Sequence, residues 1–522
     1  MKWWFARADG NKTPNLTDRS PEVHSQMLGV RMLSAIAAAT LSGAVGRSVS
    51  VEVHVSNGLP GFTIVGLPDA AVRESRDRVR AALLSSGLPW PLRRVTVNLA
   101  PSGVRKGGAG LDLAMAVGLL VATGELPAAC TEGMAFCGEL GLNGSLRHVP
   151  GMIALADATA PLQLVVPLAD LREAALVRGE AAHGVSTLAE LCGILKGQAR
   201  WPEPPLAPAT SASSGLPDLA DVRGQAVGRH ALEVAAAGAH HLLMVGPPGS
   251  GKSMLAERLP GLLPPLSHEE AMTVTRIHSA AGCALPEGVL VSRPPFRAPH
   301  HRASIVALIG GGSWSLRPGE ITLATHGILF LDEMGEFPVA ALEALRQPLE
   351  EGVIRVSRAG GTVTFPAGFL LVAAMNPCPC GEGVYPGSCK CSVIDRARYT
   401  RRLSAPLLDR FDLIVPLARP DPDDLLSDIR GESTAVSAAR VAAARSRAAD
   451  RTASGEGEPP VHPDGTRLLA SRLRAGQLSA RGLHKVSAVA RTVADLAGDE
   501  QVGHGHVCDA LSLRAARTTV TT

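Results

Sequence analysis

Residues 242–253 read Leu242-Leu243-Met244-Val245-Gly246-Pro247-Pro248-Gly249-Ser250-Gly251-Lys252-Ser253, and this stretch decides the fold of the region around it. Four apolar residues predict a buried strand, and the next eight fit the pattern G-x-x-x-x-G-K-[ST] of a phosphate-binding loop. Glycines in such a loop let backbone N–H groups converge on phosphate oxygens where a helix begins. We expect Lys252 to neutralise the β- and γ-phosphates and Ser253 to hold Mg²⁺. The alternative is a glycine turn before a helix, but the preceding strand favours a site for ATP and Mg²⁺.

A second motif lies downstream, where Ile328-Leu329-Phe330-Leu331-Asp332-Glu333 predicts an apolar strand that ends in two carboxylates. In phosphate-loop enzymes the first acid supports the metal ion, and the second is placed to polarise a water molecule. Strands often end in acids, so the motif is weak when it stands alone. Downstream of a phosphate loop it indicates ATP hydrolysis, with Asp332 and Glu333 as catalytic residues.

Composition limits the classes of protein that remain. The chain has 522 residues, 46% of them apolar and 19% charged, which predicts about three folded domains. No apolar run approaches the roughly 20 residues of a membrane-spanning helix, and the first residues lack the pattern of a secretion signal. A formal charge of +3 is too small to indicate a nucleic-acid partner by itself. Nine cysteines in such a chain favour a reducing, cytoplasmic setting over a disulfide framework.

Patterning divides the chain into five segments. We expect a disordered extension at 1–27, an α+β domain at 28–197, a Pro-, Ala- and Ser-rich linker at 198–217, an α/β domain at 218–420 and a helical domain at 421–522. Alternating apolar residues predict strands at 50–55 and 94–99, and helical spacing predicts helices at 69–86 and 111–123.

Several longer phrases resemble one known family. They are Gly58–Asp69, Phe296–His301, Leu345–Glu350, Met375–Gly381 and Leu403–Asp412. In this order they are similar to the magnesium-chelatase-like AAA+ ATPases, and specifically to the ComM/YifB family, over nearly all of the chain from Met27 on. The resemblance implies an N-terminal Lon-protease-like (ribosomal protein S5 domain 2-like) α+β domain. It further implies a P-loop AAA+ α/β domain with a parallel sheet and a C-terminal α-helical lid.

The resemblance also implies roles for three further residues. Asn376 resembles the sensor residue that positions water beside the γ-phosphate. Arg410 resembles the arginine finger inserted into a neighbouring subunit's site, and Arg481 resembles the second sensor on the helical lid. Arginines suit these tasks because the transition state spreads charge over the phosphoryl oxygens. For any one of the many arginines, a solvated or ion-paired surface position is the alternative.

The N-terminal domain lacks the residues that a Lon-type protease needs. The positions of the nucleophilic serine and its activating lysine are held by Gly108 and Ile153. Glycine cannot attack a carbonyl group. We therefore predict a non-proteolytic scaffold or DNA-guiding collar.

Four cysteines form a compact insert at 378–391. Cys378, Cys380, Cys389 and Cys391 make a C-x-C…C-x-C quartet, which matches a tetrahedral structural zinc site, although the one-residue spacing is tighter than usual. Free thiols or a redox pair are the alternatives. His300 and His301 also suggest a metal, but neighbouring residues on a strand point in opposite directions, so we expect a polar loop there.

A β-hairpin is predicted where Val353–Arg358 and Thr362–Phe365 flank Ala359-Gly360-Gly361. In the resembled family such a hairpin projects into the pore of a ring. Arg355 and Arg358 would then grip DNA phosphates. A solvated hairpin face is the alternative.

Together these features predict an ATP-driven motor: a hexameric DNA helicase or branch-migration factor that acts on single-stranded or branched DNA in recombination and natural transformation. The alternative is a magnesium-chelatase-type motor subunit that drives metal insertion into a porphyrin. An ATP-dependent protease is opposed by Gly108 and Ile153. The predicted cofactors are ATP, Mg²⁺ and structural Zn²⁺.

Overall fold

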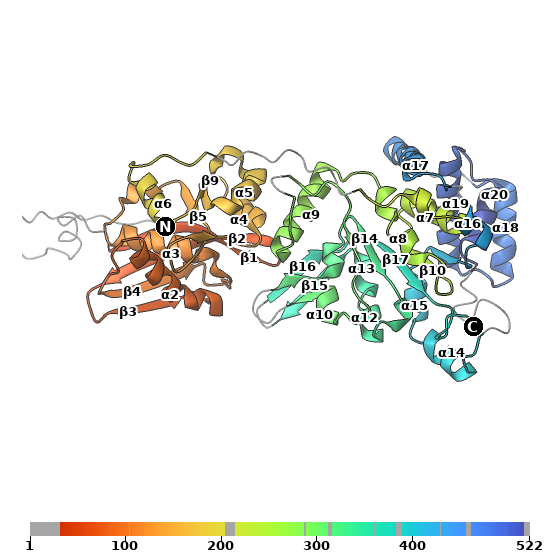
Figure 1. Cartoon of the computed structure of the whole chain (residues 1–522), viewed down its shortest axis with the longest axis horizontal. Coiled ribbons are helices and arrows are strands. Elements are labelled where there is room, and N and C mark those ends of the chain that lie inside the picture. Colours follow the sequence, from red (N-terminus) through yellow and green to blue (C-terminus); the bar gives the residue numbers. More distant parts are fainter. Residues whose placement is uncertain are drawn as a thin grey trace, which may run out of the picture.

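The computed structural model describes residues 32–103, 105–203, 215–286, 289–311, 316–358, 361–382, 389–427, 430–455 and 461–515. The predicted extension at 1–27 and most of the predicted linker lie outside these residues. An N-terminal domain (32–203), a central domain (215–427) and a C-terminal helical region (430–515) follow one another along the long axis of the molecule (Figure 1).

The N-terminal domain is built on a mixed seven-stranded sheet in the order β3-β4-β2-β1-β5-β8-β9. Its strands are β1 (Leu33–Ser42), β2 (Val45–Ser56), β3 (Gly61–Val65), β4 (Arg94–Ala100), β5 (Met134–Phe136), β8 (Gln163–Pro167) and β9 (Ala182–Val185). Its helices are α2 (Ala70–Ser85), α3 (Asp112–Ala122), α4 (Met152–Ala158), α5 (Leu171–Arg178) and α6 (Leu188–Leu195). Alternate residues of β2 are buried, and α3 is buried along its whole length. The two strands and two helices predicted in this domain are confirmed, with ends shifted by a few residues.

The central domain holds a five-stranded, wholly parallel sheet in the order β11-β14-β17-β10-β18. Its strands are β10 (Leu242–Val245), β11 (Phe296–Arg297), β14 (Ile328–Leu331), β17 (Leu370–Met375) and β18 (Leu413–Pro416). Every residue of β10, β14 and β17 is buried, because helices cover both faces of the sheet and each strand is an uninterrupted apolar run. The strands predicted at 242–245 and 328–331 are confirmed.

Helices and a hairpin surround this sheet. The helices are α7 (Ala226–Gly238), α8 (Lys252–Ala256), α9 (His268–Ala281), α10 (Ile305–Ile309), α11 (Glu320–Leu323), α12 (Val339–Glu343), α13 (Arg346–Glu351), α14 (Val393–Thr400), α15 (Ala405–Leu408) and α16 (Pro422–Leu426). The predicted hairpin is confirmed as β15 (Val353–Arg358) and β16 (Gly361–Pro366), which pair antiparallel. Short strands β6 (Glu139–Leu140) and β7 (Leu146–Arg147) pair in the N-terminal domain, and β12 (Gly310–Gly311) and β13 (Arg317–Pro318) pair beside α10.

The C-terminal region is helical, as its composition predicts. It contains α17 (Thr434–Ser454), α18 (Pro463–Arg474), α19 (Ala480–Ala497) and α20 (His504–Ser512). Val441 of α17 and Val486 of α19 share one apolar core with Leu232 of α7. The C-terminal helical region is therefore packed directly on the central domain.

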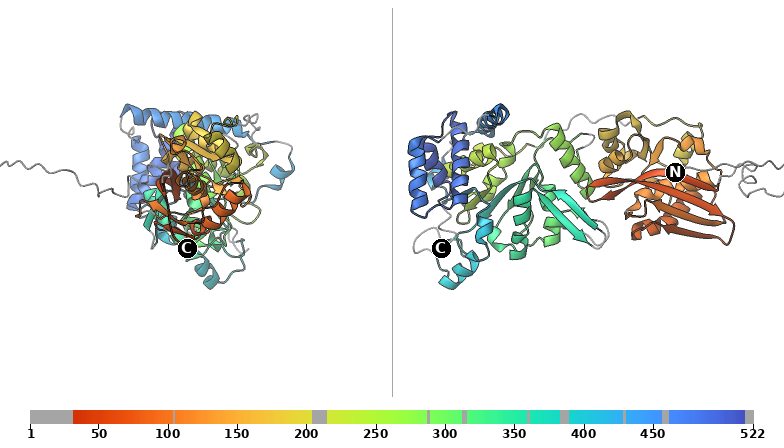
Figure 2. Two further views of the ribbon diagram at one scale, coloured as in Figure 1. Left: turned by 90° about the vertical axis from the view of Figure 1, so that its left-hand side faces the viewer. Right: turned by 180° about the vertical axis from the view of Figure 1, so that it is seen from behind.

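Among the described residues, the N-terminal domain contacts the central domain at α9 and at the β15–β16 hairpin, towards which strands β1 and β2 extend in Figure 2. At α9, the Ser279 carbonyl accepts a hydrogen bond of 3.0 Å from the Gly151 N–H, and Arg276 pairs with Asp157 at 3.4 Å. The β1–β2 turn reaches the hairpin, where a Cβ added to Gly43 would lie 2.5 Å from Val363. A glycine at φ +66° is therefore needed for this close approach.

None of the helices in the described ranges has both the length and the apolar character needed to cross a bilayer.

Candidate nucleotide-binding site

Three neighbouring strands end at one edge of the central sheet. Gly246 follows β10, Asp332 follows β14 and Asn376 follows β17. Because β14, β17 and β10 are adjacent and parallel, their carboxyl ends meet, and the residues that follow them line one crevice. Two motifs that are far apart in the sequence are thus brought together by sheet order.

The phosphate loop has the backbone that its glycines predict. Gly249 and Gly251 adopt φ values of +79° and +78°, which residues with a side chain rarely adopt. The loop is anchored to the next strand by a hydrogen bond of 3.1 Å from the Gly246 N–H to the Met375 carbonyl. Helix α8 begins at Lys252, so the loop ends where a helix starts.

Lys252 is held over the loop with only 9% of its surface exposed. Its Nζ donates to the carbonyls of Gly246 and Pro247 at 2.8 and 2.9 Å, and it lies 3.3 Å from Oδ1 of Asn376. Burial lowers the pKa of Lys252, while the carboxylates of Asp332 and Glu333 act to raise it. The ammonium group is thus held against the carbonyl oxygens of the loop and beside the Asn376 side chain.

The two residues predicted to support Mg²⁺ are also in contact. The Ser253 hydroxyl donates to Oδ2 of Asp332 at 2.7 Å. A hydroxyl and a carboxylate oxygen beside a phosphate loop are the ligands that Mg²⁺ takes in nucleotide sites, where it keeps several waters. Ser253 and Asp332 therefore fit Mg²⁺, which would supply charge neutralisation at the phosphates.

Glu333 meets a residue that sequence reasoning did not assign to the site. Its backbone lies in the left-handed region at φ +50°, and its half-exposed carboxylate is 3.1 Å from Nδ1 of His301. His300 and His301 lie at a turn, with ring centroids 4.1 Å apart. The polar loop predicted at these two residues is confirmed, and at this turn the two rings lie beside each other. The only sequence signal for His301 was its place in the phrase Phe296–His301.

The predicted arginine finger, Arg410, and the predicted second sensor, Arg481, lie in a different cluster. Arg410 forms an ion pair with Glu350, and the positive charges of Arg481 and Arg346 act with burial to lower the pKa of Arg410. Among the described residues, neither Arg410 nor Arg481 forms a hydrogen bond or ion pair with the phosphate loop. The structure therefore brings Arg410 and Arg481 to each other within one subunit and not to Lys252.

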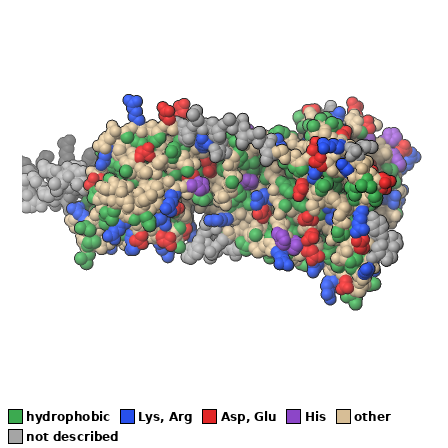
Figure 3. Space-filling model, in the orientation of Figure 1, with side chains coloured by type: hydrophobic (Ala, Val, Ile, Leu, Met, Phe, Trp, Pro, Cys, Tyr) green, Lys and Arg blue, Asp and Glu red, His purple; other side chains and the backbone are tan. Residues whose placement is uncertain are grey.

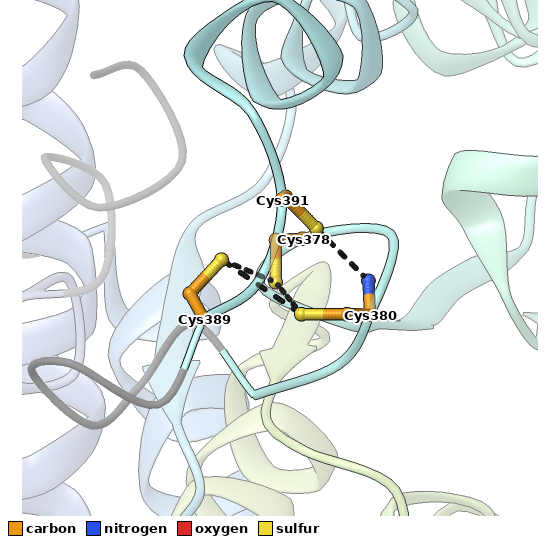
Figure 4. Close-up of side chains that lie close together, drawn as sticks. All are labelled: Cys378, Cys380, Cys389 and Cys391. Carbon is orange, nitrogen blue, oxygen red and sulfur yellow. Dashed lines mark hydrogen bonds between the residues drawn. The ribbon is translucent and has the colours of Figure 1, made fainter.

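The cysteine quartet is assembled as its spacing predicts. The four Sγ atoms of Cys378, Cys380, Cys389 and Cys391 lie within 4.8 Å of one another (Figure 4). They belong to the segment that directly follows Asn376 and to the segment that leads into α14.

The predicted DNA contacts are on the hairpin. Arg355 lies on β15 opposite Thr364, is about half exposed, and pairs with Glu351. Arg358 pairs with Gly361 in the backbone register, and its side chain lies outside the described residues.

The positions that a Lon-type dyad would occupy hold no reactive group. Gly108 adopts φ +83°, and its N–H donates to Asp69 at 3.0 Å. Ile153 is fully buried at the start of α4.

Comparisons with known proteins cover nearly the whole chain. Three family models match in succession: "Subunit ChlI of Mg-chelatase" over 51–170, "Magnesium chelatase, subunit ChlI" over 218–425, and "Magnesium chelatase, subunit ChlI C-terminal" over 431–514.

Full-length relatives agree with these matches. "Uncharacterized protein YifB" of Salmonella typhimurium is 43% identical over 480 residues, which cover 90% of this chain and 94% of YifB. "Competence protein ComM" of Haemophilus influenzae is 41% identical over 485 residues, which cover 90% of this chain and 94% of ComM. A shorter stretch of 180 residues, 34% of this chain and 23% of the relative, is 27% identical to "Probable DNA helicase MCM9" of Arabidopsis thaliana. The chain therefore belongs to the magnesium-chelatase ChlI-like family of AAA+ ATPases, together with YifB and ComM.

Proposed function

We propose that this protein is an ATP-hydrolysing motor that assembles into a hexameric ring and acts as a DNA helicase or branch-migration factor in recombination and natural transformation. The observation that carries the ATPase part is the contact of Ser253 with Asp332, beside Lys252 and Asn376. This arrangement offers a cation for the phosphates, ligands for Mg²⁺ and a carboxylate, Glu333, for the attacking water.

Each of the site residues has a separate role in ATP hydrolysis. The loop amides and Lys252 bind the phosphates, and Ser253 with Asp332 orients the metal ion. Glu333 accepts the proton of the attacking water, and the Asn376 amide orients that water. The Glu333 carboxylate must leave His301 to do so, because the two side chains are paired in this structure.

Action on DNA is supported by the hairpin and by the names of two relatives, "Competence protein ComM" and "Probable DNA helicase MCM9". Positive and negative side chains are interspersed over the face shown in Figure 3, so a DNA-binding surface must be local. Strand β15 offers Arg355, which is about half exposed and pairs with Glu351, and we propose Arg358 on the same strand as its companion; a ring would repeat both around one pore. Contacts of this kind grip phosphates without reading bases.

A ring also explains the arginine cluster. We propose that Arg410 acts on the nucleotide of a neighbouring subunit and that Arg481 acts from the lid. In the single chain Arg410 is neutralised by Glu350. Assembly would then exchange the Glu350 partner for a phosphate, an exchange that suits the planar guanidinium group.

The N-terminal domain is proposed to be a non-proteolytic scaffold with a Lon-type fold. Gly108 and Ile153 offer neither a nucleophile nor a base. Its contacts with α9 and with the hairpin suit a part that guides DNA towards the ring.

The experiment is to measure ATP hydrolysis with no DNA, with single-stranded DNA and with forked DNA, and strand displacement on the forked substrate. Stimulation and displacement are expected, and Lys252→Ala protein is the matched control that should lack both. Wild-type protein that neither binds forked DNA at low salt nor displaces a strand would contradict the helicase proposal.

The second candidate is a magnesium-chelatase-type motor that drives metal insertion into a porphyrin. The observation in its favour is that all three family descriptions refer to the chelatase subunit. Hydrolysis that is insensitive to every DNA substrate would favour this candidate.

A further inference from the structure

The four cysteines are arranged as ligands of a single ion. The Sγ atoms of Cys378 and Cys380 are 3.3 Å apart, those of Cys389 and Cys378 are 3.6 Å apart, and those of Cys380 and Cys389 are 3.8 Å apart. A zinc ion about 2.3 Å from each of four sulfurs requires tetrahedral edges of about 3.8 Å. A disulfide needs sulfurs about 2.05 Å apart, so these separations fit a shared ion better than a bond.

The fourth sulfur is placed by the backbone. The Cys380 N–H donates to Sγ of Cys391 at 3.3 Å, so the two C-x-C segments face each other, as Figure 4 shows. N–H groups aimed at sulfur stabilise a metal-bound thiolate. Four sulfur ligands select zinc or an iron–sulfur cluster among the common metals, and the quartet leaves no open position for chemistry.

One end of this cluster is joined to the phosphate loop. A Cβ added to Gly381, which has φ +82°, would lie 2.5 Å from Cδ of Pro248. Arg419 pairs with Glu382 at 2.5 Å and donates to the Pro248 carbonyl at 3.5 Å. The segment Cys378–Glu382 therefore lies directly against the loop that would hold the phosphates.

The other end is joined to the catalytic carboxylates. Cys391 immediately precedes Ser392, which caps α14, and the buried Tyr399 on α14 packs against Gly335. Gly335 follows Asp332 and Glu333 by a few residues in the chain. An ion bound to Cys378 and Cys391 would thus tie the end of β17, where Asn376 lies, to the helix that supports the Asp332–Glu333 segment.

We propose that Cys378, Cys380, Cys389 and Cys391 bind one structural Zn²⁺ ion and that this ion holds Asn376 and Pro248 in place, so that nucleotide binding depends on the metal. The metal part stands on the cysteine geometry. The dependence of nucleotide binding rests on the proposed ATP site.

The first test measures metal content of protein purified without added metal. One zinc per chain is expected in the wild type, and Cys389→Ser protein should lose it. Cys508→Ser is the matched control, because Cys508 is an exposed cysteine on α20 outside the quartet, and its zinc content should not change. Absence of zinc, iron in its place, or unchanged zinc in Cys389→Ser protein would overturn the metal site.

Because Cys389→Ser protein is expected to lose part of its fold with the ion, a second variant is needed. Cys391→His keeps a ligand for zinc and should keep both the metal and the thermal stability. Removal of zinc from wild-type protein with a chelator, followed by return of Zn²⁺, tests the same point without substitution.

The second test measures the affinity for a fluorescent ATP analogue and the rate of hydrolysis with and without the ion. A displacement of about 1 Å at a positioning group reduces turnover by roughly a hundred-fold, and re-addition of Zn²⁺ should restore it. Zinc that is bound without any effect on nucleotide affinity would overturn the coupling and leave the metal site intact. Wild-type protein that binds zinc but no nucleotide would contradict the proposed function instead.

Discussion

Two buried lysines set the N-terminal and central domains apart. Lys106 is fully buried beside the glycines of residues 107–110, and Lys252 is 9% exposed after the glycines of the phosphate loop. Burial lowers the pKa of both. Lys106 donates to the Pro101 carbonyl, whereas Lys252 lies beside Asn376 and within the electrostatic influence of Asp332 and Glu333.

The difference shows that a glycine-flanked lysine is not a site by itself. In the central domain, parallel strands deliver carboxylates and an amide to the same edge as the lysine. In the N-terminal domain, Lys106 donates to a backbone carbonyl, and the two positions compared with a Lon-type dyad hold Gly108 and the buried, apolar Ile153. Each prediction below changes one component of this contrast.

The largest effect is expected from substitution of Lys252, with substitution of Lys106 as the control. Lys252→Ala should reduce ATP hydrolysis by more than about a hundred-fold, because the phosphates lose a cation held in a site of low dielectric. Lys106→Met, which keeps the volume of the buried side chain, should leave hydrolysis unchanged. Steady-state phosphate release and nucleotide binding would measure both. If both variants lost hydrolysis to the same extent, the loss would reflect lower stability of the fold and not a specific role of Lys252 in nucleotide binding.

A similarly large effect on turnover, with binding preserved, is expected for Glu333→Gln. The amide cannot accept the proton of water, so hydrolysis should fall by about a hundred-fold or more while ATP still binds. Assembled rings should accumulate with ATP, which size-exclusion chromatography would detect. Hydrolysis at the wild-type rate would show that the site is wrongly assigned.

A smaller and more selective effect is expected at the hairpin. Arg355→Ala combined with Arg358→Ala should weaken DNA binding. It should also make the slope of log affinity against log salt concentration shallower by about one unit for each phosphate contact that is lost. Basal hydrolysis should survive, because the phosphate loop is untouched. The control is Arg73→Ala with Arg76→Ala, two exposed arginines on α2. Equal loss of DNA binding in the control pair would move the DNA contact to the N-terminal domain.

The smallest effect is expected at His301. A partly exposed polar contact between two side chains contributes about 1 kcal/mol or less, so release of Glu333 in His301→Ala should raise hydrolysis without DNA by up to roughly five-fold. His300→Ala is the matched control, because Glu333 pairs with His301 and not with His300. Unchanged hydrolysis in both variants would make the His301–Glu333 pair incidental.

Much of the fold could be predicted because local patterns dictate it. The apolar run Leu242–Val245 becomes a buried strand, alternation at 50–55 lies within a strand with one buried face, and the Ala- and Arg-rich end is helical. The two β-rich runs on either side of Ala359-Gly360-Gly361 pair as a hairpin, with Gly361 as the first residue of β16. The YifB and ComM matches confirm the resemblance that the longer phrases indicated.

The pairing of His301 with Glu333 could not be predicted. The two residues come from different loops, and only the order of the strands brings those loops together. Arg410 shows the same limit, since its partner Glu350 lies in another phrase and no local pattern links them.

By itself, the sequence determined the elements, the phosphate loop, the acidic strand end and the set of four cysteines, because each depends on residues close together in the chain. Tertiary structure alone decided which of these groups meet. The parallel order β14-β17-β10 placed Asp332, Asn376 and Lys252 at one edge, and the close approach of Gly381 to Pro248 placed the cysteine segment against the phosphate loop. Such contacts depend on the packing of whole elements, and their energies are realised only when distant segments bury a common core.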